Sequence, residues 1–430
     1  MKKLRVGVLF GGRSGEHEVS LLSAASVLNA IDRSKYEVVP IGITKEGRWV
    51  AASDAERLLS AGSGSRESGS AELGRGDSGA GDSSTLRAGD PEATASAALL
   101  ARGEEIAVSH VPANPAKALP KFDPGVVDLQ AASAISPAGN VLSVDVIFPV
   151  LHGTFGEDGT IQGLFELAEI AFVGSGVLGS AVGMDKDVMK RLFASMGLPM
   201  VKHVTFLRAE YQQHPKKTVT MVEAALRYPV FVKPANLGSS VGISKAHDRR
   251  ELGPAIELAA RYDRKIVVEQ GVGGKHGKAR ELEVAVLGND RPEASVVGEI
   301  VPAKEFYDYE AKYQTEGSKL IIPAKLNRAE TKYVRELAIA AFKACDCAGL
   351  ARVDFLMEPD TKKADKKNGA KSKPRRIYLN EVNTLPGFTS ISMYPKLWAA
   401  SGVSYTDLIT RLIELALERR AEKDQTSYTL

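Results

Sequence analysis

The stretch LRVGVLFGGRSGEHEVSLLSAASVLNAIDRSKYEVVPIGI, residues 4–43, sets the fold class. A short apolar run ends in two glycines, a segment with helical spacing of apolar residues follows, and a second apolar run closes the stretch. The order strand, helix, strand is typical of parallel α/β sheets. VDVIFPVLHG at 144–153 reads as a further buried strand that ends in a loop. We therefore expect the chain to begin with an α/β domain.

The rest of the chain alternates between helical and strand patterns. An amphipathic helix is expected within 184–200, where MDKDVMKRLFASMGLPM stops at a Gly-Leu-Pro sequence. RELEVAVLGN (280–289), VVGEIVPA (296–303) and ARVDFLME (351–358) alternate as strands of an antiparallel sheet do. A long helix over 404–423 closes the chain.

Composition narrows the class of protein. The 430 residues are 44% hydrophobic and 25% charged, and the net charge of +3 is too small to favour nucleic acid as a partner. Cys345 and Cys347 are too close for an easy disulfide and too few for a zinc site, so a reduced, cytoplasmic compartment is the simplest inference. No apolar run approaches the roughly 18 residues of a membrane span, so we expect no membrane partner.

Two segments differ from the rest in composition. More than half of residues 60–85 are Gly or Ser, so we interpret about 60–105 as a mobile insertion in a surface loop. Residues 361–376 hold eight Lys or Arg and one Asp between two strand patterns. They look like an elongated, basic hairpin loop, either simply solvated or a site for an anionic partner.

Acidic and amide side chains stand at the end of the last strand pattern. In YLNEVNTLPG (378–387), strict alternation would put Leu379, Glu381 and Asn383 on one face. Paired oxygen donors at this spacing suit a hard cation such as Mg²⁺, although a solvated sheet face would show the same pattern. Asp354, on the neighbouring strand pattern, would complete three oxygen donors across one hairpin, which favours the metal interpretation.

Glycine-rich turns supply other candidate sites. KPANLGSSVG (233–242) joins two apolar strands, and its N–H groups, hydroxyls and lysine could bind phosphate, or it could be an ordinary hairpin. The turns at 11–20 and 151–163 follow parallel strands, at the edge of the sheet where ligands bind. A single His or Glu in such a turn is nevertheless more often a structural cap than a catalytic residue. FYDYEAKY (306–313) is aromatic within a polar region and could form a lid or a small packing cluster.

These pieces together resemble the D-alanine–D-alanine ligase family of the ATP-grasp superfamily. The matching segments occur in family order and are FGGRSGEHEVS, LHGTFGEDGTIQG, MDK, VKPANLGSSVG, FYDYEAKY, ARVDF and NEVNTLPGFTSISMYP. The resemblance implies an α/β protein of three domains, with a Rossmann-like N-terminal domain (1–175), a central domain (176–270) and a C-terminal catalytic domain (271–430). It places ATP between two mostly antiparallel sheets of the last two domains.

The resemblance also implies which residues bind the two D-alanine molecules. Glu16 would hold the ammonium group of the first, with His152 nearby. Ser392 and Met393 would bind the second.

Further roles follow from the same resemblance. Arg352 and the backbone N–H of Gly387 would stabilise the tetrahedral intermediate. Ser239 and Tyr313 would join Glu16 in a hydrogen-bond chain that fixes the lid.

ATP and its metal ions account for the remaining assignments. Lys186, Lys233 and Lys312 would contact phosphates, Glu269 the adenosine and Glu281 the ribose, an assignment softened by the extra residues GGKHGKA between the last two. Two Mg²⁺ ions, for which Mn²⁺ can substitute, would be held by three side chains, namely Asp354, Glu381 and Asn383.

The implied activity is ATP-dependent synthesis of D-alanyl-D-alanine through an acyl phosphate, which supplies peptidoglycan precursors. The alternatives are a D-alanine–D-lactate ligase or another ATP-grasp ligase that joins a carboxylate to an amine. Tyr313 within FYDYEAKY resembles the dipeptide-forming enzymes. A cytoplasmic homodimer is expected because the family commonly forms dimers.

Overall fold

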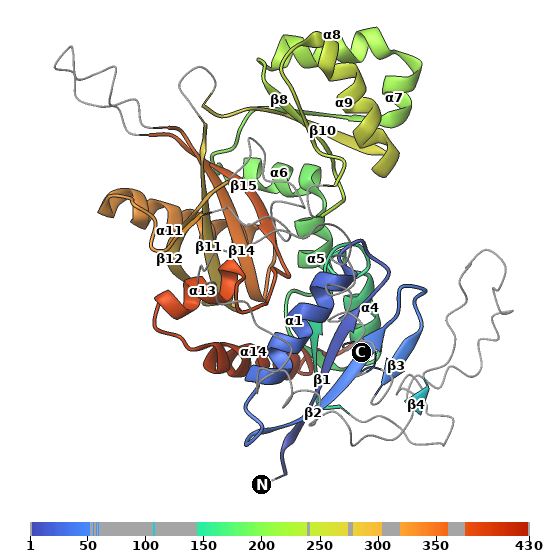
Figure 1. Cartoon of the computed structure of the whole chain (residues 1–430), viewed down its shortest axis with the longest axis vertical. Helices are drawn as coiled ribbons and strands as arrows, with labels where there is room; N and C mark the ends of the chain where they lie inside the picture. Colours follow the sequence, from blue (N-terminus) through green and yellow to red (C-terminus); the bar gives the residue numbers. More distant parts are fainter. Residues whose placement is uncertain are drawn as a thin grey trace, which may run out of the picture.

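The computed structural model describes most of the 430 residues, namely 2–51, 55, 57, 59, 106–107, 144–238, 241–273, 278–302, 319–359 and 375–428. Three β-sheets follow one another along the long axis of the molecule (Figure 1). The insertion expected at about 60–105 lies outside the described residues, as does most of the basic segment 361–376. Within the described part, no helix is long and apolar enough to span a membrane.

The first sheet has six strands in the order β4-β3-β2-β1-β5-β6. β1 pairs in parallel with β2 and β5, and β5 in parallel with β6, whereas β3 and β4 add antiparallel edges. The predicted parallel α/β start of the chain is therefore confirmed. Its elements are β1 (Leu4–Gly11), α1 (His17–Ala30), β2 (Tyr36–Ile43), β3 (Trp49–Ala51), β4 (Ile106–Ala107), β5 (Val146–Val150), α4 (Thr160–Leu167) and β6 (Ala171–Phe172).

The second sheet has four antiparallel strands in the order β7-β10-β8-β9. Helices cover one of its faces at the top of Figure 1. The glycine-rich turn predicted between two strands joins β8 to β9. The elements are β7 (His203–Leu207), α7 (Arg208–Gln213), α8 (Pro215–Ala225), β8 (Val230–Pro234), β9 (Ser244–Ala246), α9 (Arg249–Tyr262) and β10 (Lys265–Gln270).

The third sheet has five antiparallel strands in the order β13-β12-β11-β14-β15, as the alternating patterns predicted. Its strands are β11 (Arg280–Gly288), β12 (Glu293–Val301), β13 (Lys319–Ile321), β14 (Gly349–Met357) and β15 (Ile377–Asn383). The accompanying helices are α5 (Val177–Met184), α6 (Lys186–Ser195), α11 (Arg328–Ala344), α13 (Met393–Ala400) and α14 (Tyr405–Lys423).

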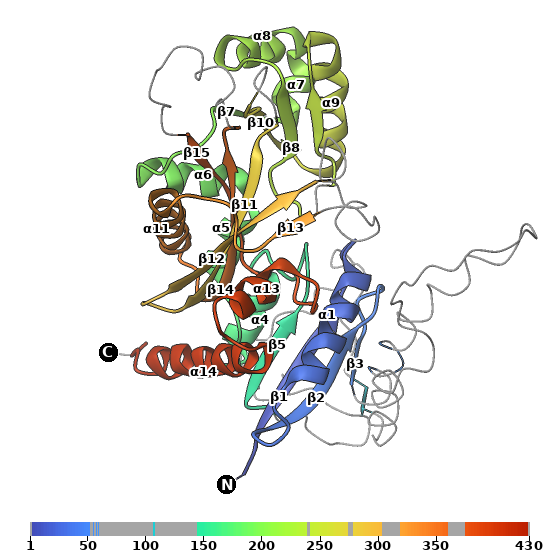
Figure 2. The ribbon, with the colours of Figure 1, turned by 60° about the vertical axis from the view of Figure 1, so that its left-hand side comes forward.

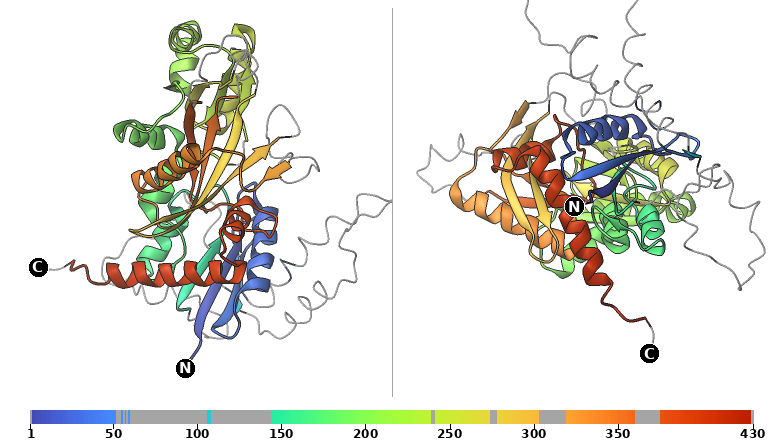
Figure 3. Two further views of the ribbon diagram at one scale, coloured as in Figure 1. Left: turned by 90° about the vertical axis from the view of Figure 1, so that its left-hand side faces the viewer. Right: turned by 90° about the horizontal axis from the view of Figure 1, so that it is seen from below.

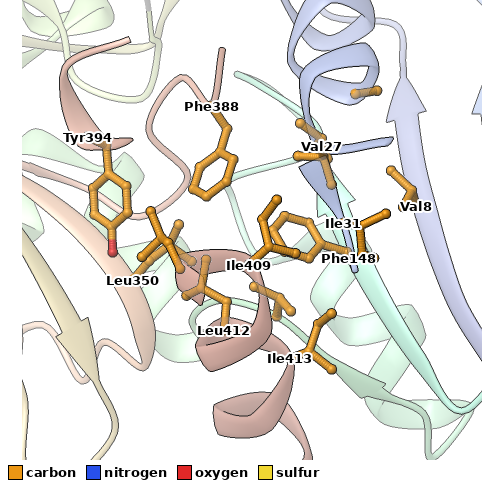
Figure 4. Close-up of a cluster of buried hydrophobic side chains, with 14 of the residues drawn as sticks. Val8, Val27, Ile31, Phe148, Leu350, Phe388, Tyr394, Ile409, Leu412 and Ile413 are labelled. Atoms are coloured by element: carbon orange, nitrogen blue, oxygen red, sulfur yellow. The ribbon is translucent and has the colours of Figure 1, made fainter. Parts of the chain in front are cut away.

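The C-terminal helix α14 joins the first and third sheets. Its residues Ile409 and Leu412 lie in a buried cluster with Phe148 of the first sheet and Leu350 of the third, as Figure 4 shows. The helix runs across the lower end of the third sheet in Figures 2 and 3. The apolar face of α14 therefore packs against both sheets, and the three share one hydrophobic core.

Helix α6 packs on the third sheet rather than on the second. Met189 and Phe193 are fully buried in a cluster with Val284 and Val353 of that sheet. The helix is amphipathic, and Asp185 caps its N-terminus by accepting two backbone N–H bonds. The domain limits given above remain predictions. Helix α6 precedes the second sheet in sequence but packs in the core of the third sheet.

A β-bulge changes the expected faces of β15. Asp354 pairs with Glu381, but the next residue, Phe355, pairs with Leu379, so Asn380 is an extra residue in the strand. The extra residue inverts the alternation. Leu379 therefore lies in the buried core, on the face opposite Glu381, and the expectation that the two share a face was wrong.

Candidate active site

Candidate residues from all three sheets meet where the sheets adjoin. The glycine-rich turn after β8 approaches the first sheet, since a Cβ atom on Gly238 would lie 3.1 Å from Glu16 Oε2. Lys186 connects the same turn to the third sheet. Its Nζ donates to the carbonyl of Leu237 at 2.8 Å and lies 3.9 Å from Glu381 Oε2. The site is therefore assembled from elements that are distant in sequence.

The three predicted metal ligands lie on adjacent strands. Asp354 faces Glu381 across β14 and β15, and Asn383 faces Arg352 in the same register. The Asn383 side-chain oxygen accepts the Leu385 N–H at 3.2 Å, so its carboxamide orientation is fixed. Two carboxylates and an amide oxygen form a hard donor set that fits Mg²⁺ or Mn²⁺ with phosphate oxygens completing the shell.

Arg352 is held by two carboxylates. Its Nε and Nη2 each donate to one Asp354 oxygen at 2.7 Å, and Nε lies 3.3 Å from Glu283. Burial alone would lower the pKa of Arg352, but Asp354 and Glu283 raise it well above its usual value. The planar guanidinium is thus a fixed positive charge, which suits stabilisation of a developing oxyanion.

A buried charge cluster connects the second sheet to α6. Glu269 on β10 lies 2.8 Å from Lys233 Nζ and 3.0 Å from Lys190 Nζ. Burial alone would raise the pKa of Glu269, but Lys190 and Lys233 lower it far below the ordinary range. Burial would likewise lower the pKa of Lys233, yet the pKa is raised because Glu269 attracts the charged form. The ammonium groups of Lys190 and Lys233 thus share one buried carboxylate.

Lys190 is a site residue that the sequence reasoning missed. Its side chain has no exposed area, and its Nζ also donates to the Asn380 carbonyl at 3.3 Å. Lys190 therefore links β10 of the second sheet to the bulge of β15 in the third. Helical spacing carried the signal, because Lys186 and Lys190 are four residues apart on one face of α6.

Lys186 lies between the glycine-rich turn and the predicted metal ligands. Its pKa is lowered by burial, an effect that the nearby Glu381 opposes. A buried ammonium group beside this turn is suited to an anionic ligand. The phosphate contact of Lys186 remains a prediction.

Two buried carboxyl groups lie together in the first sheet's loops. Glu16 lies immediately before α1, and a Cβ atom on Gly153 would lie 2.6 Å from the Glu16 Oε2 atom. Glu157 accepts the Gly153 N–H at 2.8 Å. Burial, and then the charge of Glu16, raise the pKa of Glu157 well above its usual value. The sequence pattern singled out Glu157 but gave it no role, because its burial cannot be read from the turn.

His152 connects the first sheet to the loop after β15. Its Nδ1 lies 3.1 Å from the Leu385 carbonyl, and its Nε2 lies 3.2 Å from Ser23 Oγ. Burial lowers the pKa of His152, with Glu16 opposing the shift. His152 thus lies close enough to Glu16 for that charge to oppose the shift, while burial favours the neutral ring.

The loop after β15 brings the remaining predicted residues together. A Cβ atom on Gly387 would lie 3.1 Å from Ser392 Oγ, so these two residues adjoin. Met393 begins α13 with its side chain in the core, beside Gly298. Any contact from Met393 to a ligand would therefore use its backbone N–H, which lacks an intrahelical acceptor at the start of a helix.

The other predicted ATP contacts are placed less fully. Glu281 is half-buried on β11 and is one of the carboxylates that, after burial and Glu269 are counted, raise the pKa of Lys233. It therefore faces the same site. Ser239, Lys312 and Tyr313 lie outside the described residues.

Comparisons with known proteins agree with this geometry. The family model described as D-ala D-ala ligase N-terminus matches residues 5–175, and that described as D-ala D-ala ligase C-terminus matches 192–414. A D-alanine–D-alanine ligase from Natranaerobius thermophilus is 45% identical over 427 residues, which cover 99% of this chain and 98% of that protein.

Solved structures give the same result. The VanG D-Ala:D-Ser ligase of Enterococcus faecalis is similar with a TM-score of 0.71 and 33% identity, covering 96% of this chain and 100% of that one. The D-alanine–D-alanine ligase of Coxiella burnetii is similar with a TM-score of 0.71 and 31% identity, covering 99% and 97%. From the full-length matches in sequence and fold, the chain belongs to the D-alanine–D-alanine ligase family.

Proposed function

We propose that the chain joins two D-alanine molecules to D-alanyl-D-alanine at the expense of ATP, for peptidoglycan precursor synthesis. The observation that carries the proposal is the convergence of Lys186, Arg352 and Glu381 with Glu16 at the junction of the three sheets. Buried cationic side chains lie beside carboxylates at this junction. Such cations stabilise the negative charge that develops in phosphoryl and acyl transfer. The curated relatives bear the same name as the proposed activity.

The first step forms an acyl phosphate. A free carboxylate is a poor acyl donor because its leaving group would be oxide, so an oxygen of the first D-alanine attacks the γ-phosphorus of ATP and ADP leaves. We propose that Lys186 and Lys233 bind phosphate oxygens, a role supported by the hydrogen bond of Lys186 to the glycine-rich turn after β8. Glu16 would hold the ammonium group of this D-alanine.

The second step forms the peptide bond. The amine of the second D-alanine attacks the acyl carbon, inorganic phosphate leaves, and the amine loses a proton. Negative charge collects on the former carbonyl oxygen in the tetrahedral intermediate. We propose that the Arg352 guanidinium and the Gly387 N–H stabilise that oxygen, while Ser392 and the Met393 backbone bind the second substrate.

Asp354, Glu381 and Asn383 would hold two Mg²⁺ ions, or Mn²⁺ in their place. When bound, the ions neutralise charge on the transferred phosphate. This assignment is supported by the facing positions of Asp354 and Glu381 across two paired strands. Within the residues that the structure describes, no group of three His, Cys, Asp or Glu side chains forms a metal site. The third donor here is an amide, and phosphate oxygens would complete the coordination.

The remaining assignments rest on the family resemblance. Glu269 would contact the adenosine and Glu281 the ribose, while Lys312 would reach the γ-phosphate. Ser239 and Tyr313 would link Glu16 to the lid. We also propose a cytoplasmic homodimer, and the two buried free thiols, Cys345 and Cys347, are compatible with a reducing compartment.

Phosphate release by the purified protein tests the proposal. ATP and Mg²⁺ are supplied with D-alanine, with L-alanine, or with D-alanine and D-lactate together, and product masses are read in parallel. D-alanine-dependent ADP formation and a dipeptide mass are expected. A mixed ester at neutral pH would indicate the D-lactate enzyme instead. No turnover in any mixture, from folded protein that binds ATP, would refute the substrate assignment.

A further inference from the structure

The loop after β15 is held at its backbone by side chains from distant elements. The Leu385 carbonyl accepts a hydrogen bond from His152 at 3.1 Å. The Phe388 N–H donates to Ser23 Oγ at 3.4 Å, and the Phe388 carbonyl accepts from the Tyr405 hydroxyl. Gly387 lies between these fixed points. The backbone on both sides of Gly387 is thus attached to the first sheet's loop, to α1 and to α14.

Hydrogen-bond chemistry fixes the direction of each bond. A carbonyl oxygen can only accept, so His152 donates through Nδ1–H to Leu385. The lowered pKa of buried His152 keeps the ring neutral, so Nε2 has no proton and must accept from Ser23. The Ser23 hydroxyl therefore donates to His152 while its oxygen accepts the Phe388 N–H. One hydroxyl serves both ends of the loop.

Phe388 anchors the same loop by packing. Its ring lies 5.7 Å from Phe148 in an edge-on contact, 5.9 Å from Tyr394 and 5.5 Å from Tyr405, measured between ring centroids. Figure 4 shows Phe388 between Tyr394 and the residues of the first sheet. The ring is 2% exposed, so it cannot move without opening the core. The hydrogen bonds of Ser23 therefore act on a loop whose neighbouring side chain is already fixed.

We propose that Ser23 is a positioning residue that sets the direction of the Gly387 N–H through the Phe388 backbone and His152. The proposal rests on the proposed function, in which the Gly387 N–H stabilises the tetrahedral intermediate. Ser23 is fully buried, and its hydroxyl is engaged by His152 and the Phe388 N–H. It acts on the Gly387 N–H through its hydrogen bond to the next residue, Phe388. A displacement of about 1 Å at such a donor lowers the rate without preventing substrate binding.

A purely structural role for Ser23 makes a different prediction. Were the hydroxyl needed only to satisfy buried His152, its loss would lower the stability of the first sheet and weaken every ligand equally. A positioning role lowers only the interactions made in the transition state. Comparing a transition-state analogue with a nucleotide separates the two roles.

The test compares Ser23→Ala with Ser26→Ala. Ser26 lies three residues along on α1, and its hydroxyl donates only to the Leu22 carbonyl of its own helix at 3.0 Å. Full-length protein is assayed for kcat with D-alanine, for KM of ATP, and for inhibition by a phosphinate analogue of the dipeptide in the presence of ATP. For Ser23→Ala we expect kcat to fall about tenfold, a fraction of the 10²–10³ lost with an oxyanion donor itself. Affinity for the phosphinate should fall by the same factor and KM of ATP should stay within about twofold, while Ser26→Ala matches the wild type.

Two further readouts keep the outcome decisive. Amide hydrogen exchange of the peptide spanning residues 385–389 should quicken in ligand-free Ser23→Ala and in Tyr405→Phe, but not in Ser26→Ala. Unchanged exchange and unchanged kcat in Ser23→Ala would overturn the proposal. Equal losses of ATP and phosphinate affinity would overturn it in favour of a structural role. A wild type without D-alanine-dependent turnover refutes the proposed function instead, and the exchange experiment still decides whether Ser23 holds the loop.

Discussion

Replacing Lys190 by methionine tests the buried charge cluster between the second and third sheets. The Lys190 side chain is about 1% exposed. Its Nζ lies 3.0 Å from Glu269 and donates to the Asn380 carbonyl at 3.3 Å. Methionine keeps the unbranched apolar stem and removes the charge and the donors. The change therefore isolates the electrostatic contribution of one ammonium group.

The size of the effect follows from what is left behind. Removing one partner of a buried ion pair costs about 3–5 kcal/mol, because the other charge stays buried. Glu269 keeps Lys233 at 2.8 Å, so we expect the lower end, about 3 kcal/mol. For a cooperative unit of roughly 150–250 residues, each kcal/mol corresponds to about 2–4 °C, which gives a fall in Tm of about 6–12 °C.

Calorimetry on Lys190→Met measures this fall directly. The double variant with Glu269→Gln also breaks the remaining buried pair with Lys233 and should therefore lose further stability. Arg191→Met is the matched control, because Arg191 is 72% exposed and its buried partner Asp187 keeps Lys265 at 3.5 Å, so the expected cost is about 0–1 kcal/mol. A Tm of Lys190→Met within 1 °C of the wild type, or a double variant more stable than the single, would refute the reasoning.

Three other predictions concern the site and the insertion. Glu381→Ala should abolish ATP turnover while circular dichroism stays unchanged, because a carboxylate donor is lost; near-normal phosphate release would sink the metal assignment. Glu157→Gln should become more stable relative to the wild type as pH rises, since the raised pKa of Glu157 lets the unfolded chain ionise first, from about pH 4.5 upward. Urea midpoints at pH 5 and pH 8 check the sign, and a constant difference would contradict it. Deleting residues 65–100, which contain none of the candidate site residues, should barely change kcat, and a large loss would assign that segment a functional role.

Local patterns predicted the elements of this fold well. The strand–helix–strand order of 4–43, the antiparallel strands β11, β12 and β14, and the long helix α14 were all visible from residue spacing, because burial alternates with the period of each element. The face of Leu379 was predicted wrongly, because strict alternation was assumed through Asn380 and Glu381, which are two polar residues in a row. They mark the break in the pattern, and the pairing of Asp354 and Phe355 shows that it is a bulge.

The candidate site was predictable only in part. Lys233, Arg352 and Asp354 stand in motifs whose chemistry is visible in sequence, and the structure brings them to one junction. Lys190 and Ser23 were missed because each acts through atoms more than 70 residues away in sequence. A lysine in an amphipathic helix and a serine in another look like ordinary surface residues until tertiary packing buries them.

The bulge at Asn380 also decides how far a change of loop length can reach. The connection between β14 and β15 carries the basic segment 361–376, and the register of a hairpin depends in part on the length of its loop. A bulge pins the pairing frame, since slippage would have to move the unpaired residue as well. The pairs Asp354 with Glu381 and Arg352 with Asn383 are therefore insulated from insertions upstream. The bulge thus divides β15 into two segments, 377–379 and 381–383, and the second carries the residues of the candidate site.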